Sequence, residues 1–128
     1  MAAKVVLDSS AVLAVLLVER GAETVADVIG RAHITSVNLI EVLTKLIDKG
    51  QPPSDARRSV DMLHLVVEPV DEAMALTASA MRARTKHIGL SLGDRVCLAL
   101  GLRLNAVVYT ADRIWTKADL GVEVLAIR

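Results

Sequence analysis

The hydrophobic positions of this chain form two kinds of segment. Short, continuous runs rich in β-branched residues indicate parallel strands covered on both faces, and they lie at 5–8, 33–36, 64–70, 106–110 and 122–127. Between them, apolar residues recur at helical spacing, which predicts helices at 10–19, 22–30, 37–49, 53–63, 71–86 and 92–104, with a short turn at 113–118. Strands that alternate with helices predict an α/β domain with a mainly parallel five-stranded sheet.

Length and apolar run length limit the class of protein. The 128 residues suit one domain, so we expect a single domain over 1–128. The longest uninterrupted apolar run, 11–18, is far shorter than the ~20 residues that span a bilayer, which predicts no membrane segment. The single cysteine, Cys97, permits no internal disulfide and is expected to be buried and inert, which favours the reducing cytoplasm.

Charge and aromatic content restrict the ways in which this chain can contact nucleic acid. Fifteen basic and fifteen acidic residues give a formal net charge of zero, which excludes a polycation that coats DNA or RNA. Aromatic residues make up only 2% of the chain, so few bases can stack on them. Any contact with nucleic acid is therefore expected to be local, through the backbone, or shared with a second subunit.

Acidic residues stand where several predicted strands end or helices begin. Asp8 closes the first strand, Asp112 follows the fourth, Glu41 stands in the second turn of a helix and Asp94 in the first turn of another. Crossover helices run antiparallel to the strands they connect, so strand ends and helix starts share one edge of the sheet, where open α/β sheets bind ligands. We therefore expect all four carboxylates at one edge.

Each acid also has an ordinary structural explanation. Asp8 and Asp112 suit the N-cap positions of the helices that follow them. Glu41 has the favoured spacing for an i,i+4 pair with Lys45, and Asp94 has the spacing for a capping box with Ser91. Taken singly, the structural explanation is preferred for Glu41, is the less favoured one for Asp8, and competes evenly with a functional role for Asp94 and Asp112.

Taken together, the four acids favour a metal site. Two carboxylates 4 Å apart repel each other by roughly 4 kcal/mol at an effective dielectric of ~20, which a bound cation offsets. A set of oxygen ligands suits Mg²⁺ or Mn²⁺ rather than Zn²⁺. The histidines lack ligand spacing and are expected to be structural or superficial; they are His33, His64 and His87. Hydroxyl groups at the same edge are expected to orient water or the ligating carboxylates; they are Ser9, Ser10 and Thr110.

The chemistry expected of such a site is hydrolysis of a phosphodiester by metal-activated water. No cysteine, histidine or lysine nucleophile is expected at the edge. Arg95 and Arg113 follow two of the acids directly, so they are candidates either for contact with phosphate oxygens or for ordinary surface salt bridges.

The motifs that carry these acids resemble one known family. VVLDSSAVLAVLLVE, TSVNLIEV, LSLGDRVCLALG and YTADRIW are similar to the successive acidic motifs of the PIN domain. LSLGDR followed by TADRIW resembles most the VapC toxins of bacterial type II toxin–antitoxin pairs. The likeness covers nearly the whole chain and rests on four motifs in order.

The resemblance implies a three-layer α/β/α PIN-like fold with the sheet order 3-2-1-4-5, and a Mg²⁺- or Mn²⁺-dependent endoribonuclease that cleaves RNA. It assigns catalysis and metal binding to Asp8, Glu41, Asp94 and Asp112. It also implies a homodimer and a cognate small VapB-type antitoxin that joins it in a heterotetramer or larger assembly, with the antitoxin tail lying over the active site.

Three rival interpretations fit the residues less well. A phospho-receiver module shares the acid after the first strand and a hydroxyl at Thr110, but it needs a lysine after the fifth strand, where only Arg128 follows. A phosphatase of the Asp-x-Asp type is disfavoured because Ser10 occupies the second acidic position. A catalytically idle PIN-like subunit would leave the complete acidic set without a purpose.

Overall fold

The computed structural model describes residues 2–128, which contain one five-stranded sheet. The strands are β1 Val5–Leu7, β2 Ala32–Thr35, β3 Val66–Glu68, β4 Val107–Thr110 and β5 Val124–Ala126. They lie in the order β3-β2-β1-β4-β5, and every pair runs parallel. The predicted parallel sheet and its order are confirmed.

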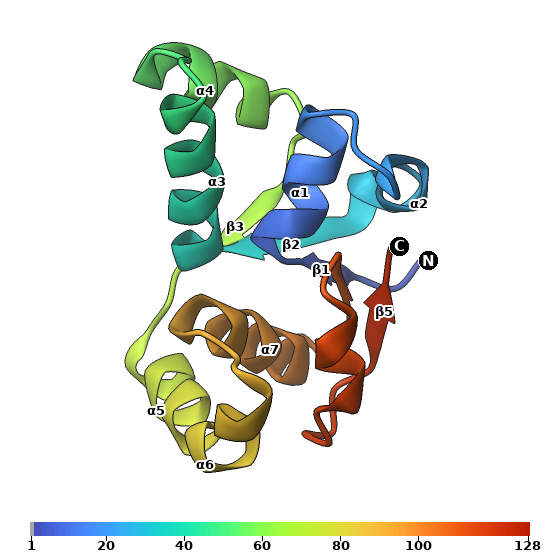
Figure 1. Ribbon diagram of the computed structural model, residues 1–128, viewed down its shortest axis with the longest axis vertical. Helices are drawn as coiled ribbons and strands as arrows, with labels where there is room; N and C mark the ends of the chain where they lie inside the picture. The colour runs from blue at the N-terminus through green and yellow to red at the C-terminus, as the bar shows by residue number, and fades with distance from the viewer. Residues whose placement is uncertain (1) are drawn as a thin grey trace.

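Helices cover both faces of this sheet, as Figure 1 shows. One layer consists of α1 Ser9–Leu16, α2 Ala22–Ala26, α3 Ser36–Asp48 and α4 Pro53–Asp61. The opposite layer consists of α5 Glu72–Ala80, α6 Arg82–Thr85 and α7 Leu92–Leu104. Three 3₁₀ turns complete the set: η1 Ile29–Arg31, η2 Lys86–Ile88 and η3 Arg113–Lys117. The predicted three-layer arrangement is therefore confirmed.

Side-chain alternation along the central strand divides the hydrophobic core in two. Val5 and Leu7 pack in a cluster with α1 to α4, whereas Val6 packs in a cluster with α5 and α7. All three residues of β1 are buried, which explains why its sequence is continuously apolar. Cys97 is buried in the second cluster, as predicted.

Several predicted elements are shorter than their sequence patterns suggested. The helix expected at 22–30 covers only Ala22–Ala26 and is followed by η1, and the strand expected at 122–127 covers only Val124–Ala126. Of the expected strand 64–70, only Val66–Glu68 pairs with β2, because His64 adopts a positive φ of 53° and Pro69, which has no N–H, follows the last paired residue. The expected helix 71–86 ends at Ala80 and resumes as α6. In this region hydroxyl groups donate to carbonyls four residues earlier, a bond that bends helices.

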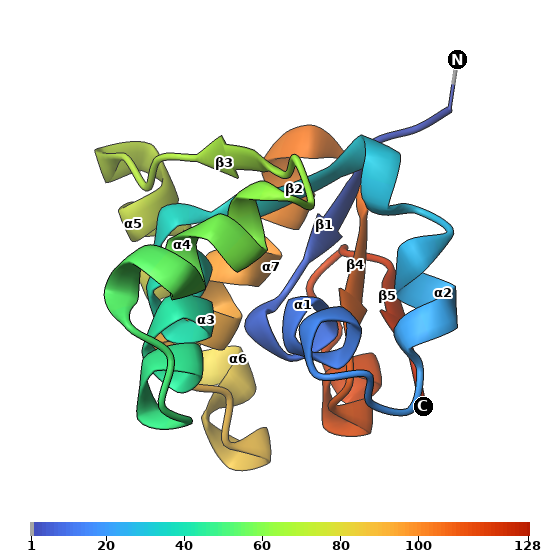
Figure 2. The same ribbon diagram turned by 90° about the horizontal axis from the view of Figure 1, so that it is seen from above.

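The strand order sets the position of the predicted site. β1 lies between β2 and β4, and the helices joined to these strands depart to opposite faces: α1 and α3 to one, α7 to the other. Such a reversal marks the ligand edge of an open α/β sheet. In Figure 2, β1 and β4 point toward the lower side of the view, where α6 also lies.

Candidate active site

Asp8 lies directly after β1 and is buried, with 4% of its surface exposed. Its carboxylate accepts hydrogen bonds from Ser10 Oγ at 2.7 Å, Thr110 Oγ1 at 2.6 Å and the Ala11 backbone N–H at 2.8 Å. The last of these makes Asp8 the N-cap of α1, so the ordinary explanation is correct, and it coexists with the position at the edge. Burial raises the pKa of Asp8 to about 6, against the opposing effect of its hydrogen bonds.

Glu41 is held by a buried chain of polar side chains within α3. Thr35 is the N-cap and its Oγ1 donates to Asn38 Oδ1 at 2.6 Å. Asn38 Nδ2 then donates to Glu41 Oε1 at 2.7 Å and to the Gly93 carbonyl at 3.1 Å. Among residues 2–128 no salt bridge joins Glu41 to Lys45, so the alternative of a surface pair was wrong.

Gly93 brings the start of α7 against this carboxylate. A Cβ at Gly93 would stand 2.5 Å from Glu41 Oε2 and 2.9 Å from its Cδ, distances that only the absence of a side chain permits. The close approach places the Glu41 carboxylate next to the residue that precedes Asp94.

Asp94 forms the expected capping box with Ser91. The Ser91 N–H donates to Asp94 Oδ2 at 2.9 Å, and the Asp94 N–H donates to Ser91 Oγ at 3.2 Å. Burial raises the pKa of Asp94, and the neighbouring charges of Glu41 and Asp112 raise it further. The carboxylate that caps the helix is therefore also within the electrostatic reach of two other predicted acids.

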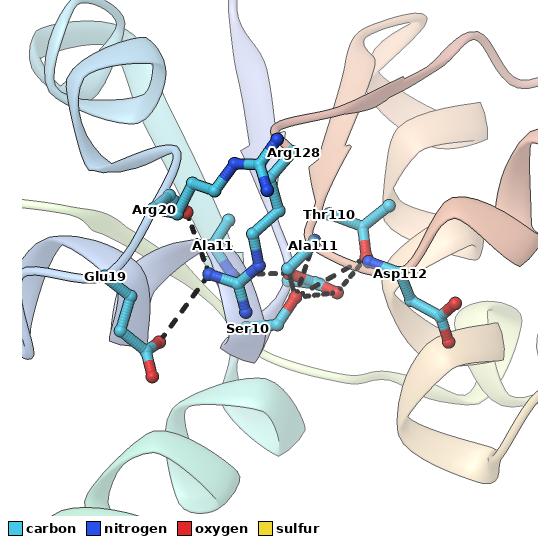
Figure 3. A network of polar contacts seen from close by, with 9 residues as sticks. Ser10, Ala11, Glu19, Arg20, Thr110, Ala111, Asp112 and Arg128 are labelled. Atoms are coloured by element: carbon cyan, nitrogen blue, oxygen red, sulfur yellow. Dashed lines mark hydrogen bonds and ion pairs between the residues drawn. The ribbon is translucent and has the colours of Figure 1, made fainter.

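Asp112 caps the η3 turn, where its Oδ1 accepts from the Ile114 N–H at 3.1 Å. Its own N–H donates to Thr110 Oγ1 at 3.1 Å, and the same hydroxyl donates to Asp8. Thr110 therefore connects two of the acids. Figure 3 shows Ser10, Thr110, Ala111 and Asp112 gathered at the junction of β4 and α1.

The hydroxyl groups predicted to support the acids do so unequally. Ser10 Oγ donates to Asp8 and accepts from the Ala111 N–H at 2.9 Å, and Thr110 connects Asp8 with Asp112 as described. In the part of the chain that the structure describes, the Ser9 side chain makes no hydrogen bond to Asp8.

The four acids share one edge and influence one another. The charge of Asp94 raises the pKa of Asp8, and Glu41 and Asp112 raise that of Asp94. Within residues 2–128 no three His, Cys, Asp or Glu side chains lie close enough to hold a metal ion as they stand. The oxygen donors of the four carboxylates are of the type that a hard divalent cation prefers. The metal-ligand set remains a prediction.

Arginines near the edge donate hydrogen bonds to backbone carbonyls, and one of them, Arg128, also pairs with an acid. Arg95 Nη1 donates to the Ala78 carbonyl at 3.0 Å, while its buried Nε has no partner within the described chain. Arg113 Nε donates to the Arg128 carbonyl at 2.9 Å. Arg128 Nη1 donates to the Arg20 carbonyl at 2.8 Å and lies 3.9 Å from Glu19 Oε1, across the start of α1 in Figure 3.

Residue patterns alone did not single out Thr35, Asn38 and Gly93. The sequence does contain a pattern that could have identified Thr35 and Asn38. Thr-x-x-Asn-x-x-Glu places an N-cap residue and two further side chains on one face of a helix. Among the histidines, the expected structural role fits His33, whose Nδ1 lies 2.9 Å from Glu68 Oε1.

Comparison with known proteins agrees with this architecture. The family model of the PIN domain matches residues 5–120. No curated protein sequence matches the chain.

Solved structures with the same fold include proteins of toxin–antitoxin systems. A toxin–antitoxin complex from Klebsiella pneumoniae is similar with a TM-score of 0.77 and 16% identity, over 98% of this chain and 98% of that chain. The DNA-bound VapBC from Salmonella typhimurium has a TM-score of 0.77 and 19% identity, over 99% and 100%. VapBC-5 from Mycobacterium tuberculosis has a TM-score of 0.64 and 22% identity, over 98% and 99%. At these identities the likeness shows the fold.

Proposed function

The chain belongs to the PIN domain family, and from this premise we propose that it is a Mg²⁺- or Mn²⁺-dependent endoribonuclease and the toxin of a type II toxin–antitoxin pair. The observation that carries the proposal is the convergence of Asp8, Glu41, Asp94 and Asp112 on the carboxyl edge of the sheet. They come from four separate segments, and two of them, Asp8 and Asp94, have raised pKa values.

This arrangement is costly for the protein unless the charges serve a purpose. An enclosed carboxylate that keeps its charge at neutral pH loses solvation, and its acidic neighbours add repulsion. The four acids would hold the divalent cation, which when bound neutralises charge on a phosphate and favours ionisation of water. Binding of a hard cation would offset both the lost solvation of the enclosed carboxylate and the repulsion between the acids.

The remaining polar groups of the site have positioning roles. Ser10, Thr110 and the Ala11 N–H orient the Asp8 carboxylate, and Asn38 orients Glu41. Asp94 is fixed by its capping box at the start of a helix whose following turns are buried. Hydrogen bonds that fix the orientation of the carboxylates in this way keep a site close to its productive geometry.

The proposed partner is a small VapB-type antitoxin. The Salmonella and Mycobacterium structures are described as VapBC assemblies, and the former is bound to DNA. For this chain we propose a homodimer that joins such a partner in a heterotetramer or larger assembly. No helix within residues 2–128 is long and apolar enough to cross a bilayer, and we propose that the protein acts in the cytoplasm, where its RNA substrate is found.

The test is cleavage of RNA by purified chain freed of any partner. Wild-type protein should cut single-stranded RNA with Mg²⁺ or Mn²⁺ and not with EDTA, and Asp94→Asn should not cut under either condition. Absence of cleavage with both ions, or equal cleavage by the variant, would refute the nuclease assignment. Incubation with a small phosphodonor separates the receiver alternative, which requires an added phosphoryl mass that Asp8→Asn removes.

A further inference from the structure

A stretch of basic residues leads directly into the acidic edge. Residues 73–93 contain no acidic residue, although the chain as a whole has a formal net charge of zero. The stretch includes the basic segment, defined here as Arg82, Arg84, Lys86 and His87, which occupies α6 and η2. All four of these residues are exposed. This part of a neutral protein therefore carries a local excess of positive charge shortly before Asp94 in the sequence.

The charges of the basic segment are not neutralised by the protein. Within residues 2–128, Arg82, Arg84 and Lys86 take part in no ion pair. Other arginines are held by partners: Arg103 pairs with Asp71 at 2.7 Å, Arg58 with Asp55 at 3.7 Å, and Arg95 donates to a backbone carbonyl. The basic segment thus presents free cationic groups on a surface where most arginines are engaged.

The backbone of the basic segment is anchored, so its charges point outward from a fixed support. Met81, Thr85 and Leu90 are buried at 4%, 0% and 1% exposure. The Thr85 hydroxyl donates to the Met81 carbonyl at 2.9 Å, and the Leu90 N–H donates to the Thr85 carbonyl at 3.4 Å. An anchored row of cations loses less conformational freedom on binding a polyanion than a mobile loop does.

The basic segment shortly precedes Asp94 in the sequence and lies on the same side of the molecule as the acidic edge. Lys86 and Ser91 are five residues apart, so their Cα atoms are at most about 18 Å apart. Ser91 begins α7 and bonds to Asp94. Figure 2 shows α6 at the side of the molecule toward which β1 and β4 point.

We propose that the basic segment binds the phosphodiester backbone of the RNA strand that is cleaved at the acidic edge, and that it thereby positions the strand. The inference rests on the proposed nuclease function. Four carboxylates repel an approaching polyanion, so a site built from acids needs a cationic flank to hold its substrate. The basic side chains lie outside the acidic edge, so they would contact RNA phosphates away from the bond that is cut. They are therefore positioning residues.

The experiment compares two triple variants that remove the same charge. Arg82→Gln, Arg84→Gln and Lys86→Gln together neutralise the basic segment. The control combines Lys4→Gln, Lys49→Gln and Arg58→Gln, which are also exposed. Lys4 precedes β1, at the end of the strand opposite Asp8, and Lys49 follows the last residue of α3, about two turns beyond Glu41. Both sets are made in the Asp94→Asn background, and binding to a labelled single-stranded RNA is measured by anisotropy against salt concentration.

The basic-segment triple should weaken binding about tenfold or more at low salt and reduce the slope of log K against log salt by up to about 2, because single strands release ~0.7 counterion per phosphate contact. The control should change affinity by less than about twofold, as expected for charges remote from the strand. With Asp94 restored, the triple should raise KM for RNA and leave kcat close to that of wild type. A charge-retaining set, Arg82→Lys, Arg84→Lys and Lys86→Arg, should bind as wild type does.

The outcomes separate this inference from the proposed function. If wild-type protein cleaves RNA but the two triples bind and cleave alike, the basic segment has no role in substrate binding and the inference is overturned. If wild-type protein binds RNA through the basic segment without cleaving it, the binding inference stands and the nuclease assignment falls. Thermal unfolding of each variant checks that the fold is retained, and loss of binding by the charge-retaining set as well would indicate a structural effect and overturn the inference.

Discussion

The Glu41 carboxylate lies against Gly93, so closely that a methyl group on Gly93 would stand 2.5 Å from Glu41 Oε2. This contact joins α3 to the start of α7, two helices that pack on opposite faces of the sheet, at the point where the acids meet. The neighbouring contact is the Asn38 amide, which donates both to Glu41 and to the Gly93 carbonyl.

Gly93→Ala should separate stability from activity. The atoms that the new methyl meets belong to the free end of a flexible side chain, so Glu41 can move aside and the fold should persist, aided by the higher helix propensity of alanine. A displaced ligand should reduce cleavage by about 100-fold. Urea unfolding and RNA cleavage measure the two effects. Gly30→Ala, where a Cβ meets nothing within 4 Å, is the control and should leave cleavage unchanged; equal activity of both variants would contradict the assigned role of Glu41.

Asp94→Asn should abolish the response of the protein to divalent cations. In wild type, Mn²⁺ should raise the thermal unfolding temperature, because a ligand that binds only the folded state stabilises it. The variant retains an oxygen to accept from the Ser91 N–H, and it removes a charge that Glu41 and Asp112 oppose. Without metal its unfolding temperature should therefore equal or exceed that of wild type. If Mn²⁺ raised the unfolding temperature of Asp94→Asn as much as that of wild type, the cation would bind at a site that does not include Asp94.

The raised pKa of Asp8 predicts that its contribution to the stability of the fold falls as the pH rises. Its pKa in the folded state, about 6, is above the ordinary value of 3.8. The group therefore favours folding at low pH, and that contribution disappears as the pH rises through about 6. The difference corresponds to about 3 kcal/mol of unfolding free energy. In EDTA, urea unfolding of wild type relative to Asp8→Asn should show this loss between about pH 4 and about pH 7; parallel profiles would mean that burial does not perturb Asp8.

Asn38→Ala should weaken both the fold and the site. It removes the amide that donates to Glu41 and to the Gly93 carbonyl, and it leaves the buried Thr35 hydroxyl without its Asn38 acceptor. Loss of buried hydrogen-bond partners should reduce the free energy of unfolding by about 1–3 kcal/mol. The Mn²⁺ concentration needed for half-maximal cleavage should also rise. The control is Ser59→Ala, which removes hydroxyl bonds to the Asp55 carbonyl and to Gln51 Oε1; it should leave the metal dependence unchanged and alter the free energy of unfolding by less than Asn38→Ala does. An Asn38→Ala protein with wild-type metal dependence would show that Glu41 is positioned by other contacts.

The sequence predicted best those features that depend on local periodicity. The helix expected at 37–49 is Ser36–Asp48, and Gly50 adopts the positive φ of 106° that a residue after a helix favours. The position of Asp94 was predictable for the same reason, since a capping box needs only residues three apart. The shared edge of the acids followed from the direction of crossover helices and not from any one residue.

What could not be predicted depends on contacts between distant segments. The Asn38 amide meets a carbonyl 55 residues away, and no local pattern encodes that encounter. Glu41 has the spacing for a pair with Lys45, but in the folded protein it accepts instead from the buried Asn38 amide, which the contact with Gly93 holds in place. The division of the predicted helix 71–86 depends on hydroxyl groups whose choice of partner only the packed structure determines.

The strand order has a consequence for the synthesis of this protein. β1 is synthesised before the other strands of the sheet, yet its neighbour β4 begins at Val107 and the fourth acid is residue 112. A nascent chain therefore has no complete set of acids until residue 112 has been translated, and chains that terminate before it lack one. If the proposed activity is correct, unfinished molecules are harmless to the RNA around them, including the message from which they are being made.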